Sequence, residues 1–203
     1  GKRWHDMLKE DKGAEAALEL IKAFSQKDMD MDPNAPELQK SVWSLTVEAA
    51  EKYNDPGKFT AFIGYEWTSL IAGNNLHRVV IYRDNMDKTI NDVPSTTYVS
   101  QDPETLWEHL NTYQETTGGQ VLAIPHNGNL SNGIMFAETR VNGEPYDNNY
   151  FKERIKWEPL YEITQIKGDG ETHPFLSPND EFADFENWDV GNLDLSAVKT
   201  EDM

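Results

Sequence analysis

The sequence predicts an α/β fold in which strands alternate with helices, either as a mainly parallel sheet or as a segment of a β/α barrel. Three observations carry this prediction. Short, nearly all-apolar runs rich in β-branched and aromatic residues are typical of buried parallel strands. Runs with apolar residues three to four positions apart, typical of amphipathic helices, lie between them. Turn sequences containing Gly, Pro, Asn and Asp separate the two kinds of run.

The N-terminal part of the chain is predicted to be helical. Residues 14–24 and 38–52 both carry apolar side chains at the spacing of an amphipathic helix. The turn sequence Tyr-Asn-Asp-Pro-Gly follows at 53–57 and ends the second helix. Residues 1–56 are therefore predicted to form a helical N-terminal segment.

The central part, residues 57–177, is predicted to hold the α/β domain. Its predicted strands are the short apolar runs 59–65, 79–82, 121–124 and 160–166. One helix starts at Pro103, with Asp102 as its cap, and stops at Gly118, and a second spans 148–157. The last stretch, 178–203, is acidic and has no sustained period, so we expect a loop or tail there.

Charge and composition exclude several classes of function. The chain has 36 Asp and Glu against 18 Lys and Arg, a formal net charge of −18. This balance argues against nucleic-acid partners and anionic membrane surfaces, which both require clustered basic residues. No apolar run approaches the ~18 residues of a membrane span, so we expect a soluble protein. Cysteine is absent, which excludes disulfides and thiolate metal ligands.

Three ligand-type residues lie next to predicted strands. Glu66 directly follows the first strand, His77 opens the second, and His126 follows the third after one proline. In parallel α/β folds the site lies beyond the carboxyl ends of the strands. Carboxylate and imidazole suit zinc, manganese and iron. The three residues together predict part of a metal centre, although each one alone is more often a solvated or structural residue.

Three further residues are weaker candidates for an additional site. Glu171 and His173 lie in a Gly-rich turn after the fourth predicted strand, where a simply solvated loop is the competing interpretation. Arg78, next to His77, can pair with a phosphate, and an outward-facing salt bridge is an equally good interpretation. His109 lies at helical spacing between apolar residues, which predicts a packing or surface role.

A second class of function is a non-catalytic binding module. Tyr65, Trp67 and Trp107 would then form an aromatic platform for a sugar or peptide. Core packing is the competing interpretation of these rings, and we favour it because large rings commonly fill cores.

The strongest motifs resemble one family. They are Gly64-Tyr65-Glu66-Trp67-Thr68-Ser69, Asn75-Leu76-His77-Arg78 and Ile124-Pro125-His126-Asn127-Gly128-Asn129. The sequence resembles the domain of unknown function 3604 family, a branch of the PHP (polymerase and histidinol phosphatase) superfamily of metal-dependent phosphoesterases.

The resemblance carries expectations of fold and activity. It implies a partial, distorted β/α barrel with mainly parallel strands, whose metal ions are held by Glu66, His77 and His126. It also implies metal-assisted hydrolysis of a small phosphorylated substrate. Exported relatives in this branch imply a periplasmic parent protein.

Two motifs of the superfamily do not occur in this sequence. They are the His-x-His of the first barrel strand and the Asp-x-His near the end of the domain. We therefore expect an internal fragment that binds metal weakly and has little activity. An apolar barrel seam would then be exposed and would allow self-association.

Overall fold

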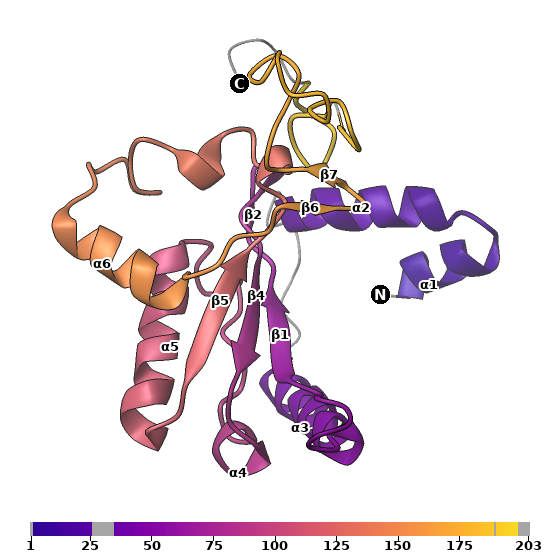
Figure 1. Cartoon of the computed structure of the whole chain (residues 1–203). Helices are drawn as coiled ribbons and strands as arrows, with labels where there is room; N and C mark the ends of the chain where they lie inside the picture. The colour runs from indigo at the N-terminus through magenta and orange to yellow at the C-terminus, as the bar shows by residue number, and fades with distance from the viewer. Residues whose placement is uncertain (1, 26–34, 189, 199–203) are drawn as a thin grey trace.

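The centre of the computed structural model, which describes residues 2–25, 35–188 and 190–198, is a three-stranded antiparallel sheet in the order β1-β4-β5 (Figure 1). These strands are β1 (Ile63–Trp67), β4 (Arg78–Tyr82) and β5 (Val121–Pro125). Tyr65 lies opposite Val80, and Val80 lies opposite Ala123. Two short antiparallel pairs accompany the sheet: β2 (Leu70–Ile71) with β3 (Asn74–Asn75), and β6 (Thr164–Gln165) with β7 (Gly168–Asp169).

The helices confirm most of the helical predictions. They are α1 (Lys2–Lys9), α2 (Gly13–Ser25), α3 (Ala35–Tyr53), α4 (Met86–Thr89), α5 (Pro103–Thr117) and α6 (Asn148–Trp157), with 3-10 turns η1 (Gly128–Leu130) and η2 (Ile134–Phe136). The Asp102 carboxylate accepts the N–H of Glu104 at 3.0 Å and caps α5, which ends at Gly118 with φ 61°. The helix predicted from Pro103 thus has the expected ends, because its caps are local sequence signals.

The hydrophobic core lies on one face of the sheet. Helices α3, α5 and α6 cover this face through buried side chains such as Val47, Leu110 and Trp157. The strands contribute alternate residues to the same core, among them Trp67 and Val80. Because side chains alternate along a strand, the residues between them point to the opposite face of the sheet.

The predicted mainly parallel, barrel-like arrangement is wrong. All strand pairs among the described residues are antiparallel, and they form no closed barrel. The chain between β4 and β5 explains the error. Ser69 Oγ donates to the carbonyl of Gln101 at one end of the sheet, and Lys88 Nζ donates to the carbonyl of Gly118 at the other. Residues 90–101 therefore run back along the length of the sheet before α5 starts, and α5 then returns the chain to the end of the sheet at which β4 finished. Because β5 starts from that end, it runs antiparallel to β4.

The fourth predicted strand, 160–166, is also wrong for most of its length. Only Thr164–Gln165 is a strand, and it pairs with β7 in a hairpin rather than with the central sheet. Ile163 and Ile166 are exposed, so the apolar run that predicted a buried strand is not buried.

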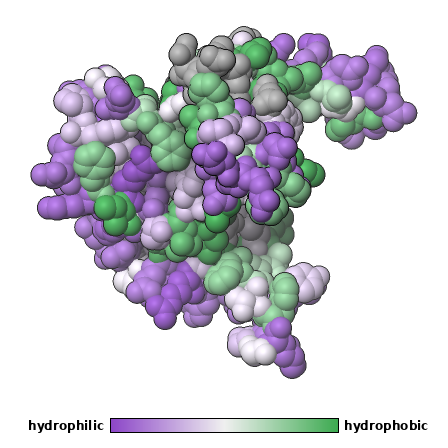
Figure 2. Space-filling view, turned by 45° about the horizontal axis from the view of Figure 1, so that its top comes forward, coloured by the Kyte–Doolittle hydropathy of each residue, from purple (hydrophilic) through white to green (hydrophobic). Residues whose placement is uncertain are grey.

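The barrel seam expected to allow self-association presupposes a barrel, which the described strands do not form. Figure 2 shows hydrophobic side chains in several separate groups among hydrophilic ones, and the arm formed by the N-terminal helices is mostly hydrophilic. Without a barrel, the seam predicted for self-association has no counterpart among the described residues. The helices that the structure describes include none with the length and apolar character needed to cross a membrane.

A polar group on the core side of the sheet includes His109 of α5. Tyr82 donates its hydroxyl hydrogen to Asp92 Oδ2 at 2.6 Å, and His109 Nε2 lies 3.6 Å from Asp92 Oδ1. Burial lowers the pKa of the His109 imidazole, and the Asp92 carboxylate opposes this effect in part. His109 has the packing role that its helical spacing predicts.

We expect His109 to make the protein less stable in acid. In the unfolded chain this imidazole binds a proton near pH 6.5, whereas the lowered pKa keeps it neutral in the folded protein. The unfolded state thus binds more protons below about pH 6.5, and the free energy of unfolding falls as the pH is lowered through that value. Urea titrations at pH 7.5 and 5.5 measure this change. Between the two pH values, the free energy of unfolding should fall less for His109→Gln than for the wild type. His5→Gln, at an exposed histidine, should behave like the wild type, and equal losses in all three proteins would contradict the prediction.

Candidate metal centre

Glu66, His77 and His126 meet at one edge of the central sheet. Glu66 lies near the end of β1, His77 directly precedes β4, and His126 directly follows β5. Because neighbouring strands are antiparallel, the end of β1, the start of β4 and the end of β5 share this edge. The N–H of His126 donates to the carbonyl of His77 at 3.3 Å, which continues the β4–β5 register by one pair.

The three side chains form a compact cluster on the sheet face away from the core. His126 Nε2 donates to Glu66 Oε1 at 2.8 Å, and His77 Nδ1 donates to the same oxygen at 3.1 Å. One ligand atom from each residue lies within 4.8 Å of the other two. The imidazole rings are buried, whereas the Glu66 side chain is 48% exposed. The histidines thus form the buried part of the cluster, and the carboxylate opens it to solvent.

The electrostatics favour an ionised Glu66 carboxylate and a neutral His77 imidazole at neutral pH. The hydrogen bonds from His126 and then His77 hold the pKa of the Glu66 carboxyl well below its usual range. Burial lowers the pKa of the His77 imidazole, although the bond to Glu66 opposes this. An ionised carboxylate and neutral imidazoles are the states in which these groups bind metal ions.

Each histidine also has a second, buried ring nitrogen. His77 Nε2 and His126 Nδ1 have no hydrogen-bond partner among the described residues. If Nδ1 of His77 and Nε2 of His126 bind a metal, each ring must carry its proton on the other nitrogen. The donor set fits a divalent ion, since two imidazoles and a carboxylate form a known three-ligand set that leaves coordination positions open.

The other two candidates of the Gly-rich turn are not part of this cluster. Glu171 is exposed, and its backbone N–H donates to Asp169 Oδ1 at 2.7 Å. His173 Nδ1 accepts the N–H of Phe175 at 3.2 Å. Only Glu66, His77 and His126 among the described residues bring three such ligand atoms together.

Arg78 points to the opposite face of β4 from His77. Its Nε donates to Glu158 Oε1 at 2.9 Å, and the side chains of both residues are at most 3% exposed. Trp107 Nε1 donates to the same oxygen at 2.9 Å, and Arg154 Nε lies 3.5 Å from Glu158 Oε2. Arg78 therefore forms a buried ion pair, which differs from both the phosphate-binding and the outward-facing interpretation.

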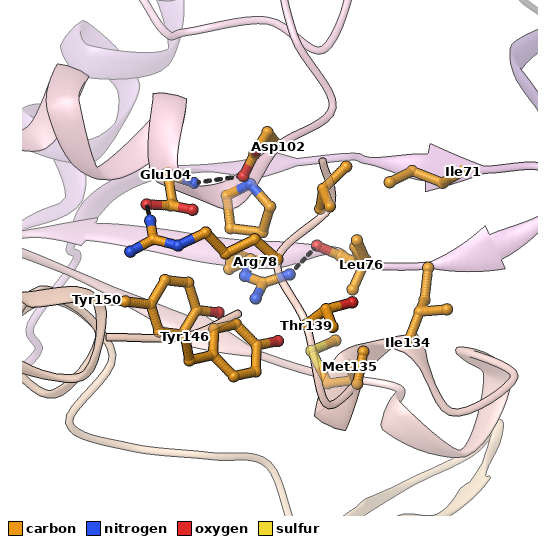
Figure 3. A pocket seen from close by; sticks show the side chains of 14 residues that line it. Ile71, Leu76, Arg78, Asp102, Glu104, Ile134, Met135, Thr139, Tyr146 and Tyr150 are labelled. Carbon is orange, nitrogen blue, oxygen red and sulfur yellow. Dashed lines mark hydrogen bonds and ion pairs between the residues drawn. The ribbon is translucent and has the colours of Figure 1, made fainter. Parts of the chain in front are cut away.

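A cavity of about 200 Å³ lies on this core side and is lined by Arg78 but by none of the three cluster residues. Figure 3 shows the Arg78 guanidinium at its wall, near the rings of Tyr146 and Tyr150. A second lining arginine, Arg140, pairs with Glu104 and, at 2.8 Å, with Asp147. The charges around this cavity are thus mutually compensated, and the cavity has no unpaired cation for an anionic ligand.

The aromatic residues of the alternative binding module lie in or against the core. Trp67 and Trp107 are 1% and 3% exposed, and Tyr65 packs against the same core cluster. The two indole rings are therefore buried in the core, whereas Tyr65 is only partly buried.

Two further residues lie in or beside the loop that carries His126: Asn127, which belongs to a motif quoted from the sequence, and Lys167, which sequence reasoning did not single out and whose carbonyl accepts a hydrogen bond from Asn129 at 2.9 Å. Asn127 directly follows His126 and is 1% exposed. Lys167, in the β6–β7 turn, is one of the charges that act on His77. The sequence does set Lys167 apart in one respect: it is the only Lys or Arg between Lys156 and Lys199, in a stretch rich in Asp and Glu.

Comparison with known proteins assigns the family. The family model described as "Protein of unknown function (DUF3604)" matches residues 1–203, and the chain belongs to this family. No curated protein and no solved structure matches the chain.

Proposed function

We propose that this member of the DUF3604 family binds a divalent metal ion through Glu66, His77 and His126 and hydrolyses a small phosphoester with it. The observation that carries the proposal is the cluster of two buried imidazoles and one half-exposed carboxylate, with ligand atoms within 4.8 Å of one another. Resemblance of the same motifs to the PHP superfamily supports a phosphoester rather than another substrate class.

The chemistry of the donor set supports zinc, manganese or iron as the ion. Imidazole nitrogen and carboxylate oxygen are common ligands of all three, and three protein ligands leave room for water and substrate. A divalent ion bound there would lower the pKa of a coordinated water and withdraw charge from a phosphoryl oxygen.

The residues of the chain have distinct roles in this proposal. The buried rings of His77 and His126 hold the ion from the sheet side, and their burial keeps them in fixed orientations. Glu66 supplies one negative charge, so that a divalent ion leaves the site with a net positive charge. This local charge matters because the chain as a whole carries −18 and would otherwise repel an anionic substrate.

Metal titration of the full chain tests the proposal. After EDTA treatment and dialysis, the protein is titrated with Zn²⁺, Mn²⁺ and anaerobic Fe²⁺ by calorimetry. We expect saturation at one ion per chain for at least one of these metals. Because the chain supplies three of the ligands and lacks two motifs of the superfamily, we expect weak metal binding, and the loaded protein should hydrolyse p-nitrophenyl phosphate only slightly faster than the metal-free protein, a difference that EDTA removes. No binding of any of the three metals would overturn the metal site, and binding without metal-stimulated hydrolysis would overturn the phosphoesterase assignment.

A further inference from the structure

The peptide groups on both sides of His126 are bonded to one residue, Glu162, which lies just before β6. The N–H of Glu162 donates to the carbonyl of Pro125 at 3.2 Å, and the N–H of Asn127 donates to Glu162 Oε2 at 2.9 Å. The N–H of His126 itself donates to the carbonyl of His77 at 3.3 Å. Figure 1 shows β6 close to the end of β5, after which His126 follows. The backbone of this proposed ligand is thus held before, at and after the residue.

The turn after His126 depends on a hydrogen bond from outside the turn. Asn127 has φ 53° and ψ 43°, a left-handed conformation that residues other than glycine rarely adopt. The side chain of Asn127 does not hold this turn, since its amide nitrogen and oxygen have no hydrogen-bond partner among the described residues. The bond from its N–H to the Glu162 carboxylate is charge-assisted and therefore stronger than a bond between neutral groups. Glu162 thus stabilises the conformation in which the chain leaves His126.

The Glu162 carboxylate is itself oriented by a neighbour, Gln165 of β6. Gln165 Nε2 donates to Glu162 Oε1 at 2.8 Å and to Oε2 at 3.0 Å, and both side chains are half-buried. Glu162 forms no ion pair with any residue that the structure describes, and it is not one of the three residues whose ligand atoms come together. Its contacts are therefore directed at the loop that carries His126.

We propose that Glu162, oriented by Gln165, is a positioning residue that holds His126 with its Nε2 toward Glu66 and the metal ion. This inference rests on the proposed function and adds to it two residues that do not bind the metal themselves. In the structure His126 Nε2 lies 2.8 Å from Glu66 Oε1, so the ring already has the direction that a shared ion requires. A ligand that is held in place before the ion arrives loses less conformational freedom on binding.

Metal titration of two variants tests this role. Calorimetry is carried out on the full chain with Zn²⁺, Mn²⁺ or Fe²⁺, whichever ion the wild type binds. We expect Glu162→Leu to weaken binding by about 10- to 100-fold, because leucine cannot accept the N–H of Asn127. Glu162→Gln should retain most of the affinity, since its amide oxygen can accept this bond while Gln165 turns its own oxygen toward the new NH₂ group. Equal losses in both variants would show that the charge of Glu162 matters rather than its hydrogen bonds, and would overturn the proposal.

Glu51→Leu is the matched control. Glu51 is also a half-buried glutamate, and its Oε1 accepts the N–H of Met86, likewise 35 positions away in the sequence, at 3.1 Å. Met86 follows the end of β4, whereas the cluster lies at the start of this strand. The control should bind metal like the wild type, and a loss as large as that of Glu162→Leu would show an effect of general destabilisation instead. If circular dichroism shows that Glu162→Leu does not fold, Gln165→Leu takes its place: weaker metal binding supports the proposal, and wild-type binding overturns it.

Hydrogen exchange in the metal-free protein separates this inference from the proposed function. We expect Glu162→Leu to speed exchange of the amide hydrogens of His126 and Asn127, measured by NMR, by about tenfold or more, because a hydrogen bond to a charged group is lost. Glu51→Leu should leave both rates unchanged. If the wild type binds no metal, the proposed function fails and these rates decide: faster exchange supports the role of Glu162 in holding His126, and unchanged rates overturn it. If the wild type binds metal and Glu162→Leu binds it as tightly, the role of Glu162 is overturned and the metal site stands.

Discussion

Replacing Glu66 with Gln is expected to weaken metal binding by more than about 100-fold, because even outer residues of metal sites change affinity by about 10- to 100-fold and Glu66 is proposed as a direct ligand. The substitution keeps the shape of the side chain but removes its negative charge. It also replaces one carboxylate oxygen by an NH₂ group, which donates hydrogen bonds and is not a metal ligand, next to the nitrogens of His77 and His126. Since the Glu66 side chain is 48% exposed, folding should be little affected.

Calorimetric titration with the metal that binds the wild type measures this effect. Glu171→Gln is the matched control: it makes the same chemical change at an exposed carboxylate outside the cluster. The control should bind metal like the wild type. If Glu66→Gln retained wild-type affinity, Glu66 would not be a ligand, and a loss in Glu171→Gln would place the site elsewhere.

The second large effect is expected on stability, for Glu158→Ala. Glu158 accepts hydrogen bonds from Arg78 and Trp107, and its side chain is 2% exposed. Its removal leaves the Arg78 guanidinium buried without its carboxylate partner. Breaking a buried ion pair in this way lowers the free energy of unfolding by about 3–5 kcal/mol.

Urea denaturation of the metal-free protein measures this loss. Glu19→Ala is the comparison, because it breaks an ion pair at the surface: the side chains of Glu19 and Arg3 are 37% and 75% exposed. It should lower the free energy of unfolding by less than about 1 kcal/mol. Replacing both partners, as in Arg78→Met with Glu158→Leu, should recover part of the loss, since the fully buried guanidinium is removed together with its carboxylate partner. A cost for Glu158→Ala as small as that of Glu19→Ala would show that this pair contributes little.

Local signals predicted the helices well and the sheet poorly. Asp102 and Gly118 mark the ends of α5 within the sequence itself, so its bounds could be predicted. Strand direction depends on how the chain travels between strands. Residues 90–101 form neither helix nor strand along most of their length, and sequence periodicity holds no signal for the extra pass they make. Alternating strands and helices therefore suggested parallel neighbours where the structure has antiparallel ones.

The sequence singled out Glu66, His77 and His126 because all three residues lie at or next to the ends of strands. Glu66 and His126 lie at the ends of their strands and would share one edge of a parallel sheet as well. His77 precedes its strand, so it joins them only because β4 runs antiparallel to β1 and β5. Lys167 and Glu158 could not be found in this way. Lys167 lies beside Asn129 through a hairpin, and Glu158 meets Arg78 across 80 positions of sequence. Such contacts depend on the tertiary fold.

The opposite orientations of His77 and Arg78 restrict the pairing of β4. A shift of β4 by one residue against its neighbours would turn every side chain to the other face. The guanidinium would then face Glu66 and leave Glu158 unpaired in the core, while the imidazole would leave His126. A one-residue shift of β4 would thus lose favourable contacts on both faces of the strand. The residues proposed for ligand binding therefore also help to discriminate the native strand alignment from its nearest misfolded competitor.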